Sequence, residues 1–414
     1  MNPGLRPILW DIYEEHLDEA AFLWGQWERA LVAAHLTLQD VIDGPEERLL
    51  AHLDALVLGG KRVAEKLLFP ALEDSDEGKV FAATWALVQA EDADHLDAVL
   101  EALALAKPPA RAAMGRALEL STARDDLPRR LAPFWQKSEP PVHGAILDAL
   151  ARDAKWTAEH LAGCLSEPDV TVQRAALRAL RRMPDLPHHG RVEDLLRSED
   201  AAIRQEAIAT GYVMRVRGVG EACLREAQAM GDGCRLPLAL LALRGEAVDR
   251  ELLMARLAVS EAKRHAIWAM GFLGDTATAD LLVSMLDDEK VARVAGEALT
   301  AITGIVIAGP LVKPGVTKGP GVEDVGPDDE VPEALPEDLL LVPNAVAVRK
   351  WWARERGRFR VGTRYSRGEA RESEKAHDTL RLATMWRRTG LSLEAHGTTH
   401  ASDGRLRGWA RAQR

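Results

Sequence analysis

The sequence has 414 residues, of which 47% are hydrophobic and 28% are charged, and its formal net charge is -11. This balance excludes an intrinsically disordered chain, and the acidic total argues against general nucleic-acid binding, which needs a concentrated basic face. The three cysteines, Cys164, Cys223 and Cys234, are widely spaced and form no C-x-x-C pair, so we expect neither a disulfide framework nor a zinc knuckle.

The amino-terminal residues contain no apolar signal segment, and no run of about 18 apolar residues follows them. We therefore expect no signal peptide, no membrane-spanning helix and a cytoplasmic location. Aromatic residues make up only 5% of the chain, while Ala and Leu recur throughout, which favours helices. The fold class that we expect is all-α.

Residues 1–73 are expected to form a helical cap at the N-terminus. Apolar residues follow a helical period from Leu9 to Leu36, and two further helices are predicted at Pro45 to Leu58 and Gly60 to Leu72, with Gly59-Gly60 as the break. This region also holds three tryptophans that we interpret mainly as core or dimer contacts: Trp10, Trp24 and Trp27.

Most copies of a sequence repeat lie in residues 74–304. Each copy contains an Ala-Leu-like pair, and successive pairs are 29 to 32 residues apart. The pairs are Ala55-Leu56, Ala86-Leu87, Ala117-Leu118, Ala149-Leu150, Ala179-Leu180, Thr210-Gly211, Ala239-Leu240, Ala269-Met270 and Ala298-Leu299. In four repeats an Asp lies ten residues before the pair, where we expect it to cap the second helix of the unit. These residues are Asp76, Asp169, Asp200 and Asp288.

Two amphipathic helices in about 30 residues cannot bury both faces alone, so neighbouring units must stack. The pattern predicts a right-handed HEAT-like α-solenoid of about eight two-helix repeats, whose second helices line the concave face. Tetratricopeptide and ankyrin signatures do not occur. The short spacing resembles the compact HEAT-like repeats first recognised in bilin lyases.

The composition changes after the repeats. Residues 305–343 hold 7 Pro, 5 Gly and 8 acidic residues without a helical period, which predicts a linker. Residues 344–414 hold 17 Lys or Arg against 7 Asp or Glu, a formal charge of +10, whereas the remainder carries -21. We expect this basic segment to be partly helical and to dock on the acidic solenoid.

Within the basic segment, six residues are candidates for docking or for partner binding: Trp351, Trp352, Arg354, Arg358, Arg364 and Tyr365. Adjacent residues on a helix do not share a face, so at least one of the two tryptophans is expected to pack into the solenoid. A basic run with aromatic residues also leaves single-stranded nucleic acid open as a ligand.

Three strings carry a resemblance to a known family: EEHLDEAAFLW at Glu14 to Trp24, EERLLAHLDAL at Glu46 to Leu56, and KWWARERGRFRVGTRYSRGE at Lys350 to Glu369. They resemble an uncharacterised proteobacterial family of HEAT-repeat proteins, and the resemblance covers nearly the whole chain. It implies a HEAT-repeat fold without known catalytic residues. It also implies an adaptor or accessory role near type VI secretion effector-delivery clusters. The polar stretch Gly397 to Arg414 departs from a repeat.

Candidate chemistry is sparse. The acidic cluster Glu14 to Glu19 lacks the repeated Glu-x-x-His arrangement of a di-iron bundle, and His188-His189 has no carboxylate partner nearby in sequence. No nucleotide-binding, nucleophile-elbow or H-E-x-x-H motif occurs. We expect no catalytic, cofactor-binding or metal-binding residues, and therefore no cofactor.

These observations predict a non-enzymatic protein-binding scaffold or adaptor that uses the concave face of a HEAT-like solenoid. The alternative is an enzyme on such a scaffold, either bilin-lyase-like or DNA-glycosylase-like. A glycosylase would use Asp153 with Trp156 and Trp268 against a flipped base. The acidic solenoid opposes that alternative, because it repels DNA. The partner's identity and the oligomeric state are left open.

Overall fold

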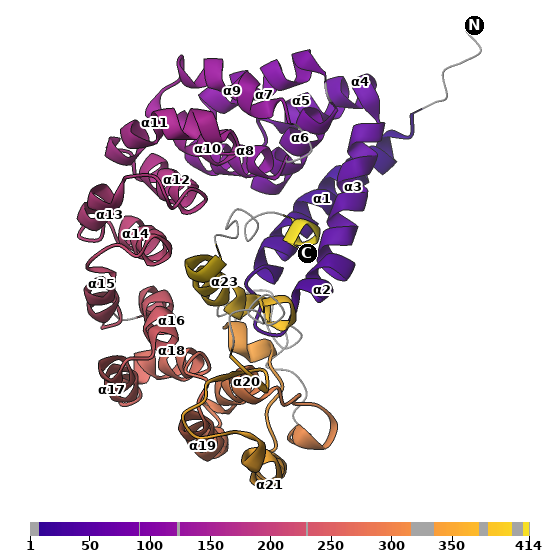
Figure 1. Ribbon diagram of the computed structural model, residues 1–414. Helices are drawn as coiled ribbons and strands as arrows, with labels where there is room; N and C mark the ends of the chain where they lie inside the picture. Colours follow the sequence, from indigo (N-terminus) through magenta and orange to yellow (C-terminus); the bar gives the residue numbers. More distant parts are fainter. Residues whose placement is uncertain are drawn as a thin grey trace, which may run out of the picture. The chain divides into compact units, whose positions relative to one another are not determined.

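The computed structural model describes residues 8–90, 92–121, 125–228, 231–315, 335–371, 380–399 and 409–413. It divides into two compact units (Figure 1). Unit 1 comprises residues 1–31, 39–188 and 404–414, and unit 2 comprises residues 32–38 and 189–403. Among the described residues, the only strands are β1 (Tyr365–Ser366) and β2 (Glu369–Ala370), which pair antiparallel. The predicted all-α HEAT-like fold is confirmed.

Unit 1 is a series of helices joined by short turns. Its elements are α1 (Trp10–Ala30), α2 (Leu38–Val41), the π-helix η1 (Ile42–Glu46), α3 (Glu47–Leu58), α4 (Gly60–Val63), the π-helix η2 (Ala64–Leu68), α5 (Phe69–Ala71), α6 (Glu77–Gln89), α7 (Ala93–Leu105), α8 (Pro108–Leu120), α9 (Leu127–Trp135), α10 (Pro140–Leu150), α11 (Ala154–Ser166), α12 (Val170–Arg181) and η11 (Ala410–Gln413). The long helix predicted from Leu9 to Leu36 ends earlier, at Ala30.

Unit 2 is also built mainly from helices joined by turns. Its elements are α13 (His189–Leu195), α14 (Ala201–Met214), α15 (Val219–Glu226), η3 (Gly231–Cys234), α16 (Arg235–Arg244), α17 (Ala247–Arg256), α18 (Ser260–Met270), α19 (Thr276–Ser284), η4 (Met285–Asp287), α20 (Ala292–Thr303), η5 (Gly309–Leu311), η7 (Pro336–Leu339), α21 (Ala345–Glu355), η8 (Arg356–Arg358), β1, β2 and α23 (Met385–Thr399).

The second helices of the repeats are α6, α8, α10 and α12 in unit 1 and α14, α16, α18 and α20 in unit 2. In unit 1, α6 contacts α8, α8 contacts α10 and α10 contacts α12; in unit 2, α16 contacts α18 and α18 contacts α20. Both residues of the pair at Ala179-Leu180, in α12, are fully buried. Small residues allow the close approach: a Cβ added at Gly115 of α8 would lie 2.5 Å from the carbonyl oxygen of Ala145 in α10.

Three of the four predicted aspartate caps are confirmed. The carboxylates of Asp76, Asp169 and Asp200 accept hydrogen bonds from backbone N–H groups in the first turns of α6, α12 and α14. The prediction for Asp288 is wrong, because the short helix η4 lengthens the connection and α20 begins only at Ala292. The carboxylate of Asp288 instead accepts hydrogen bonds from Lys263 Nζ at 2.7 Å and the backbone N–H of Lys290 at 3.2 Å.

Part of the segment predicted as a linker, 305–343, is held in place at its two ends. Val312 and Pro343 form an isolated antiparallel bridge, and the N–H of Lys313 donates to the carbonyl of Val342 at 2.8 Å. Residues 316–334 lie outside the described residues. The segment 344–414 contributes α21, the β1–β2 turn and α23 to unit 2, and η11 to unit 1.

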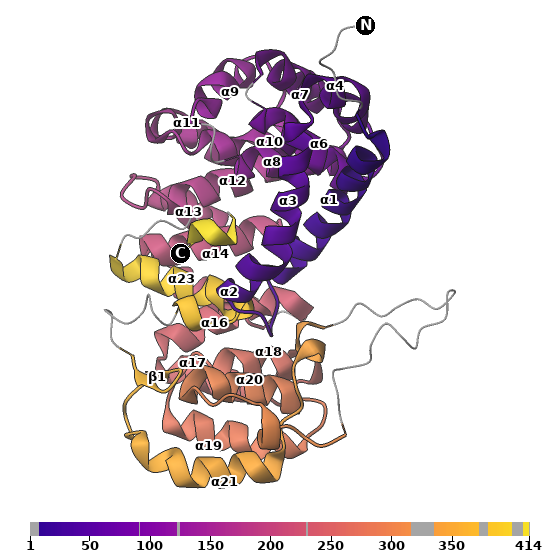
Figure 2. The same cartoon turned by 90° about the vertical axis from the view of Figure 1, so that its right-hand side faces the viewer.

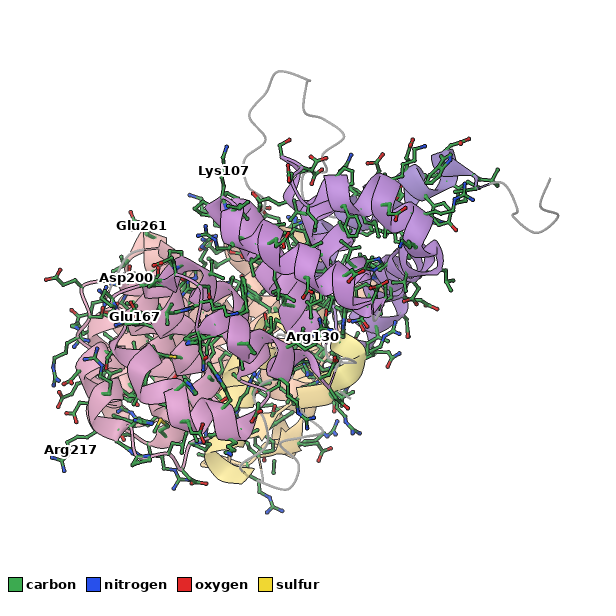
Figure 3. All side chains as sticks on the ribbon, turned by 90° about the horizontal axis from the view of Figure 1, so that it is seen from above. Lys107, Arg130, Glu167, Asp200, Arg217 and Glu261 are labelled. Carbon is green, nitrogen blue, oxygen red and sulfur yellow. The ribbon has the colours of Figure 1, made fainter. Side chains whose placement is uncertain are left out.

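Charged side chains surround the helices (Figure 3). Lys107 in unit 1 and Arg217 in unit 2 are both exposed and point away from the ribbons in this view. None of the helices in the described part of the chain combines the length and the apolar character that crossing a membrane requires.

Candidate functional site

One position of the repeat places its side chains on a shared face of the second helices. It is the residue immediately before each Ala-Leu-like pair from Ala86-Leu87 onward, and we call these residues the inner ladder. The inner ladder consists of Trp85, Arg116, Asp148 and Arg178 in unit 1, and of Ala209, Leu238, Trp268 and Glu297 in unit 2. None of the sequence-based predictions used this position, although its constant offset from the pair could have identified it.

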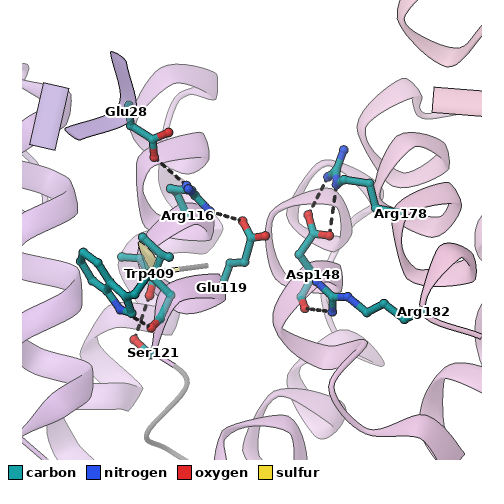
Figure 4. Close-up of polar contacts among 10 residues, drawn as sticks. Glu28, Arg116, Glu119, Ser121, Asp148, Arg178, Arg182 and Trp409 are labelled. Atoms are coloured by element: carbon teal, nitrogen blue, oxygen red, sulfur yellow. Dashed lines mark hydrogen bonds and ion pairs between the residues drawn. The ribbon is translucent and has the colours of Figure 1, made fainter. Parts of the chain in front are cut away.

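Two ion-pair groups contain inner-ladder residues of unit 1, and one of them joins two such residues (Figure 4). Arg116 donates from Nε to Glu28 at 2.7 Å and from Nη1 to Glu119 at 2.9 Å. Arg178 of α12 pairs with Asp148 of α10, with distances of 3.2 Å from Nε and 2.6 Å from Nη2. Burial opposes the charge of Arg116, but the carboxylates of Glu119 and Glu28 outweigh it and raise the pKa of the guanidinium.

These residues border a groove of 520 Å³ over α8, α10 and α12. Small residues that line it are Pro108, Ala112, Gly115, Pro141, Gly144 and Ala145. Charged residues that line it are Arg111, Arg116, Glu119, Asp148, Asp169, Arg174 and Arg178. The groove thus combines small residues, of which Pro108, Ala112 and Pro141 are exposed, with a mixed set of fixed charges, which suits a polypeptide segment better than an apolar small molecule.

The carboxyl-terminal turn η11 lies against another part of unit 1. The indole Nε1 of Trp409 donates to the carbonyl of Leu120 at 3.0 Å, and its ring centroid lies 4.9 Å from that of Trp27 and 6.1 Å from that of Trp85. The Glu46 carboxylate accepts a hydrogen bond from the backbone N–H of Arg411 at 2.9 Å. The inner-ladder position Trp85 is therefore in contact with the chain's own terminal residues.

In unit 2 the inner ladder holds a helix of the same chain. Helix α23 packs against α14 and α16 (Figure 2). At its beginning, Trp386 lies 5.4 Å from Trp268 between ring centroids, and Arg387 donates to both oxygens of Glu297 at 2.6 and 2.5 Å. Two consecutive residues of α23 thus meet two consecutive positions of the inner ladder.

The six predicted docking or partner-binding residues all lie in unit 2 and fall into two groups. Trp352 is only 5% exposed, and its Nε1 donates to Asp280 of α19 at 2.8 Å. Arg356, which the sequence analysis did not select, pairs with the same carboxylate at 2.8 and 2.7 Å. These hydrogen bonds lower the pKa of Asp280, that from Arg356 most, against the opposing effect of burial.

Arg364 and Tyr365 also point inward. The Arg364 guanidinium donates four hydrogen bonds of 2.8 Å to backbone carbonyls. Two acceptors, Ala242 and Leu243, lie in the last turn of α16, and the other two, Phe272 and Leu273, follow the end of α18. Tyr365 is buried, its N–H donates to the carbonyl of Gly274 at 2.7 Å, and its hydroxyl accepts a hydrogen bond from the N–H of Arg360 at 2.7 Å.

Of the other three candidates, two are exposed and one is half-buried. Arg354 and Arg358 are exposed and both pair with Glu355, at 3.1 and 2.9 Å. Trp351 is half-buried and lies 6.2 Å from Trp352 between ring centroids. The structure therefore does not gather the six residues into one surface: Trp352, Arg364 and Tyr365 are engaged within unit 2.

The residues named for a glycosylase-like site have structural partners. The Asp153 carboxylate caps α11 by accepting hydrogen bonds from the N–H groups of Lys155 at 3.0 Å and Trp156 at 3.1 Å. The Trp156 ring stacks on His160 with a centroid distance of 4.5 Å, and Trp268 is buried beside Trp386. A flipped base would need Asp153 and both tryptophans to leave these contacts. Each of the three cysteines is buried.

Comparison with known proteins supports the repeat assignment. Residues 262–288, which span most of α18, α19 and η4, match the PBS lyase HEAT-like repeat. No curated protein matches the chain. The X-ray structure of YibA from Escherichia coli aligns with 72% of this chain and 99% of that chain at 16% identity and a TM-score of 0.33, a similarity too low to support any functional argument.

Proposed function

We propose that this protein is a non-enzymatic scaffold or adaptor, and that the groove over α8, α10 and α12 in unit 1 receives a segment of its protein partner. The observation that carries the proposal is the use of the same face in unit 2, where the inner ladder holds α23 through Trp268 and Glu297. Repeat faces of this kind are extended surfaces that suit polypeptide ligands. The corresponding positions of α10 and α12 border an open groove instead.

The fixed charges indicate what the segment should look like. Arg116, Asp148 and Arg178 are satisfied by neighbouring side chains, so a partner need not neutralise them. Three small residues that line the groove, Pro108, Ala112 and Pro141, are exposed and leave room for the partner's backbone and short side chains. We therefore propose a polar, extended or helical peptide segment as the ligand. The family resemblance is the basis for a further proposal, that the adaptor acts in effector delivery by type VI secretion.

The test uses a photo-crosslinking amino acid at Ala112, which is exposed and lines the groove, in cells that produce the protein naturally. The matched control carries the same amino acid at Ala154, which is exposed on α11 and does not line the groove. We expect one partner to be crosslinked from position 112 and not from position 154. An Ala112→Trp variant should then lose that partner without a change in melting temperature.

Equal crosslinking from both positions, or retention of the partner by the Ala112→Trp variant, would reject the groove as the binding surface. An effector or another secretion component as the partner would support the delivery role. A metabolic enzyme or a ribosomal protein in its place would contradict that role while leaving the scaffold proposal intact.

A further inference from the structure

Unit 2 contains a second cavity that the scaffold proposal does not use. It has a volume of 220 Å³ and lies between α20, the β1–β2 turn and the start of α23. Its lining includes four arginines, Arg293, Arg367, Arg371 and Arg387, against the single carboxylate of Glu297. The excess of fixed positive charge in a partly enclosed space points to an anionic ligand.

Arg387 is the most buried of these cations, with a side chain that is 4% exposed. Its Nε and Nη2 bind Glu297 at 2.6 and 2.5 Å, and Nη2 also donates to the carbonyl of Trp268 at 3.1 Å. Its Nη1 has no hydrogen-bond partner among the described residues. A buried charged donor without an acceptor is costly, so this N–H group calls for an acceptor in the cavity.

Two further groups in the lining have unused donors. The main chain of Arg367 is fixed by a hydrogen bond of 2.8 Å from its N–H to the carbonyl of Ala301, but within the described part of the chain its guanidinium makes no hydrogen bond. The buried Thr384 hydroxyl likewise has no partner there. Burial lowers the pKa of Arg367; Glu297 opposes this effect and the nearby Arg387 adds to it.

The other two arginines are held by the protein. Arg371 donates from Nη1 to the carbonyl of Phe272 at 3.1 Å and pairs with Glu394 at 3.2 Å. Arg293 donates from Nη1 to the carbonyls of Asp338 and Leu340, both at 3.0 Å. They therefore contribute charge to the cavity, whereas Arg367, Thr384 and Arg387 supply the available donors.

Apolar side chains complete the lining: Phe272, Ile307, Leu340 and Leu391. A partly enclosed cavity with this lining suits a small organic molecule. Gly271 is important to this geometry, because a Cβ there would lie 2.5 Å from Nη2 and 2.6 Å from Nη1 of Arg387.

We propose that this cavity binds a small organic acid, whose oxyanion accepts hydrogen bonds from Arg387 Nη1, the Arg367 guanidinium and the Thr384 hydroxyl, while its apolar part lies against Phe272. Guanidinium groups form charge-assisted and often bidentate hydrogen bonds with carboxylates and phosphates, so the oxyanion can be of either kind. The inference is independent of the scaffold proposal, since the groove lies in unit 1.

The experiment is isothermal titration calorimetry of the full chain with two acids of similar shape, benzoate and phenyl phosphate, and with benzyl alcohol as the uncharged control. We expect at least one acid to bind with a stoichiometry of one and benzyl alcohol not to bind. Arg367→Gln should weaken the binding by about tenfold or more, because a charge-assisted hydrogen bond is lost. Thr384→Val should weaken it as well, whereas Arg354→Gln, at an exposed residue outside the cavity, should leave it unchanged.

Melting temperatures of the variants are measured alongside, so that a loss of binding is not confused with a loss of folding. Preference for benzoate would identify a carboxylate ligand, and preference for phenyl phosphate a phosphate monoester. The proposal is overturned if neither acid binds at millimolar concentration, or if the folded Arg367→Gln variant binds as tightly as the unaltered chain.

Discussion

Arginine side chains in this protein satisfy the carbonyl groups that repeat helices leave unpaired at their carboxyl ends. Arg364 reaches carbonyls in the last turn of α16 and just after α18, Arg182 donates to the carbonyl of Asp148 at 3.3 Å, and Arg152 donates to that of Ser121 at 3.0 Å. The last four carbonyls of a helix have no partner within it, and a cation near them also interacts favourably with the helix dipole. A basic sequence can therefore serve the fold itself, without any acidic ligand.

Replacement of Arg364 by Lys tests this role. An ammonium group cannot reach four carbonyls arranged around a planar guanidinium, so several acceptors would lose their donor. We expect Arg364→Lys to lower the free energy of unfolding by about 1–3 kcal/mol in urea titrations. Arg358→Lys, at an exposed residue of the same segment, should change it by less than about 0.5 kcal/mol. Equal effects of Arg364→Lys and Arg358→Lys would show that the hydrogen bonds of the Arg364 guanidinium do not stabilise the fold.

The buried cysteines give a prediction about reactivity and pH. Burial raises the pKa of Cys164 to about 11 and that of Cys223 to about 12, so neither forms an appreciable thiolate at pH 8 in the folded protein. Iodoacetamide should label them only after addition of denaturant. Because the ordinary pKa is 9.0, the unfolded chain loses these protons first as pH rises, and stability should fall between about pH 9 and pH 12. Rapid labelling of the native protein would contradict the predicted burial.

At the scale of the helices, the sequence predicted what is repeated and failed where a local insertion occurs. The pair at Ala179-Leu180 and the cap at Asp169 recur at fixed offsets, because each repeat buries the same helical face. The prediction that Asp288 caps α20 is wrong because η4 adds a turn before that helix. The sequence of Met285–Asp287 does not show that a short 3-10 helix forms there.

The register of the second helices can be tested with alanine-to-leucine changes. Ala176 in α12 and Ala295 in α20 are fully buried, so the three additional carbons of a leucine side chain must displace neighbouring atoms. We expect each change to destabilise the fold by about 1–3 kcal/mol in thermal or urea unfolding. Ala154→Leu, at an exposed residue of α11, is the control and should have little effect. Similar losses in all three variants would show that the register is wrong.

At the scale of the whole molecule, the candidate sites could not be derived from the sequence because their residues are distant in the chain. Glu297 and Arg387 form a buried ion pair across 90 positions, and Arg364 reaches Ala242 across 122. The net charges showed that residues 344–414 are basic and that the rest of the chain is acidic, but they did not show which side chains contact one another. Composition suggested a basic binding surface around Arg364, whereas tertiary structure uses that residue to terminate helices.

The two adjacent tryptophans of α21 allow the docking of the basic segment to be tested with a matched pair of variants. Trp352 is buried and bonded to Asp280, so Trp352→Ala removes a large apolar contact and leaves the carboxylate with one donor fewer. Truncation of a buried tryptophan costs about 3–5 kcal/mol, whereas an exposed ion pair contributes only about 0–1 kcal/mol and is screened by salt. We expect Trp352→Ala to lower the melting temperature markedly at both low and high salt. Trp351→Ala, at the half-buried neighbour, should lower it far less. Scanning calorimetry at two salt concentrations checks this, and equal melting of both variants would mean that α21 is not anchored through Trp352.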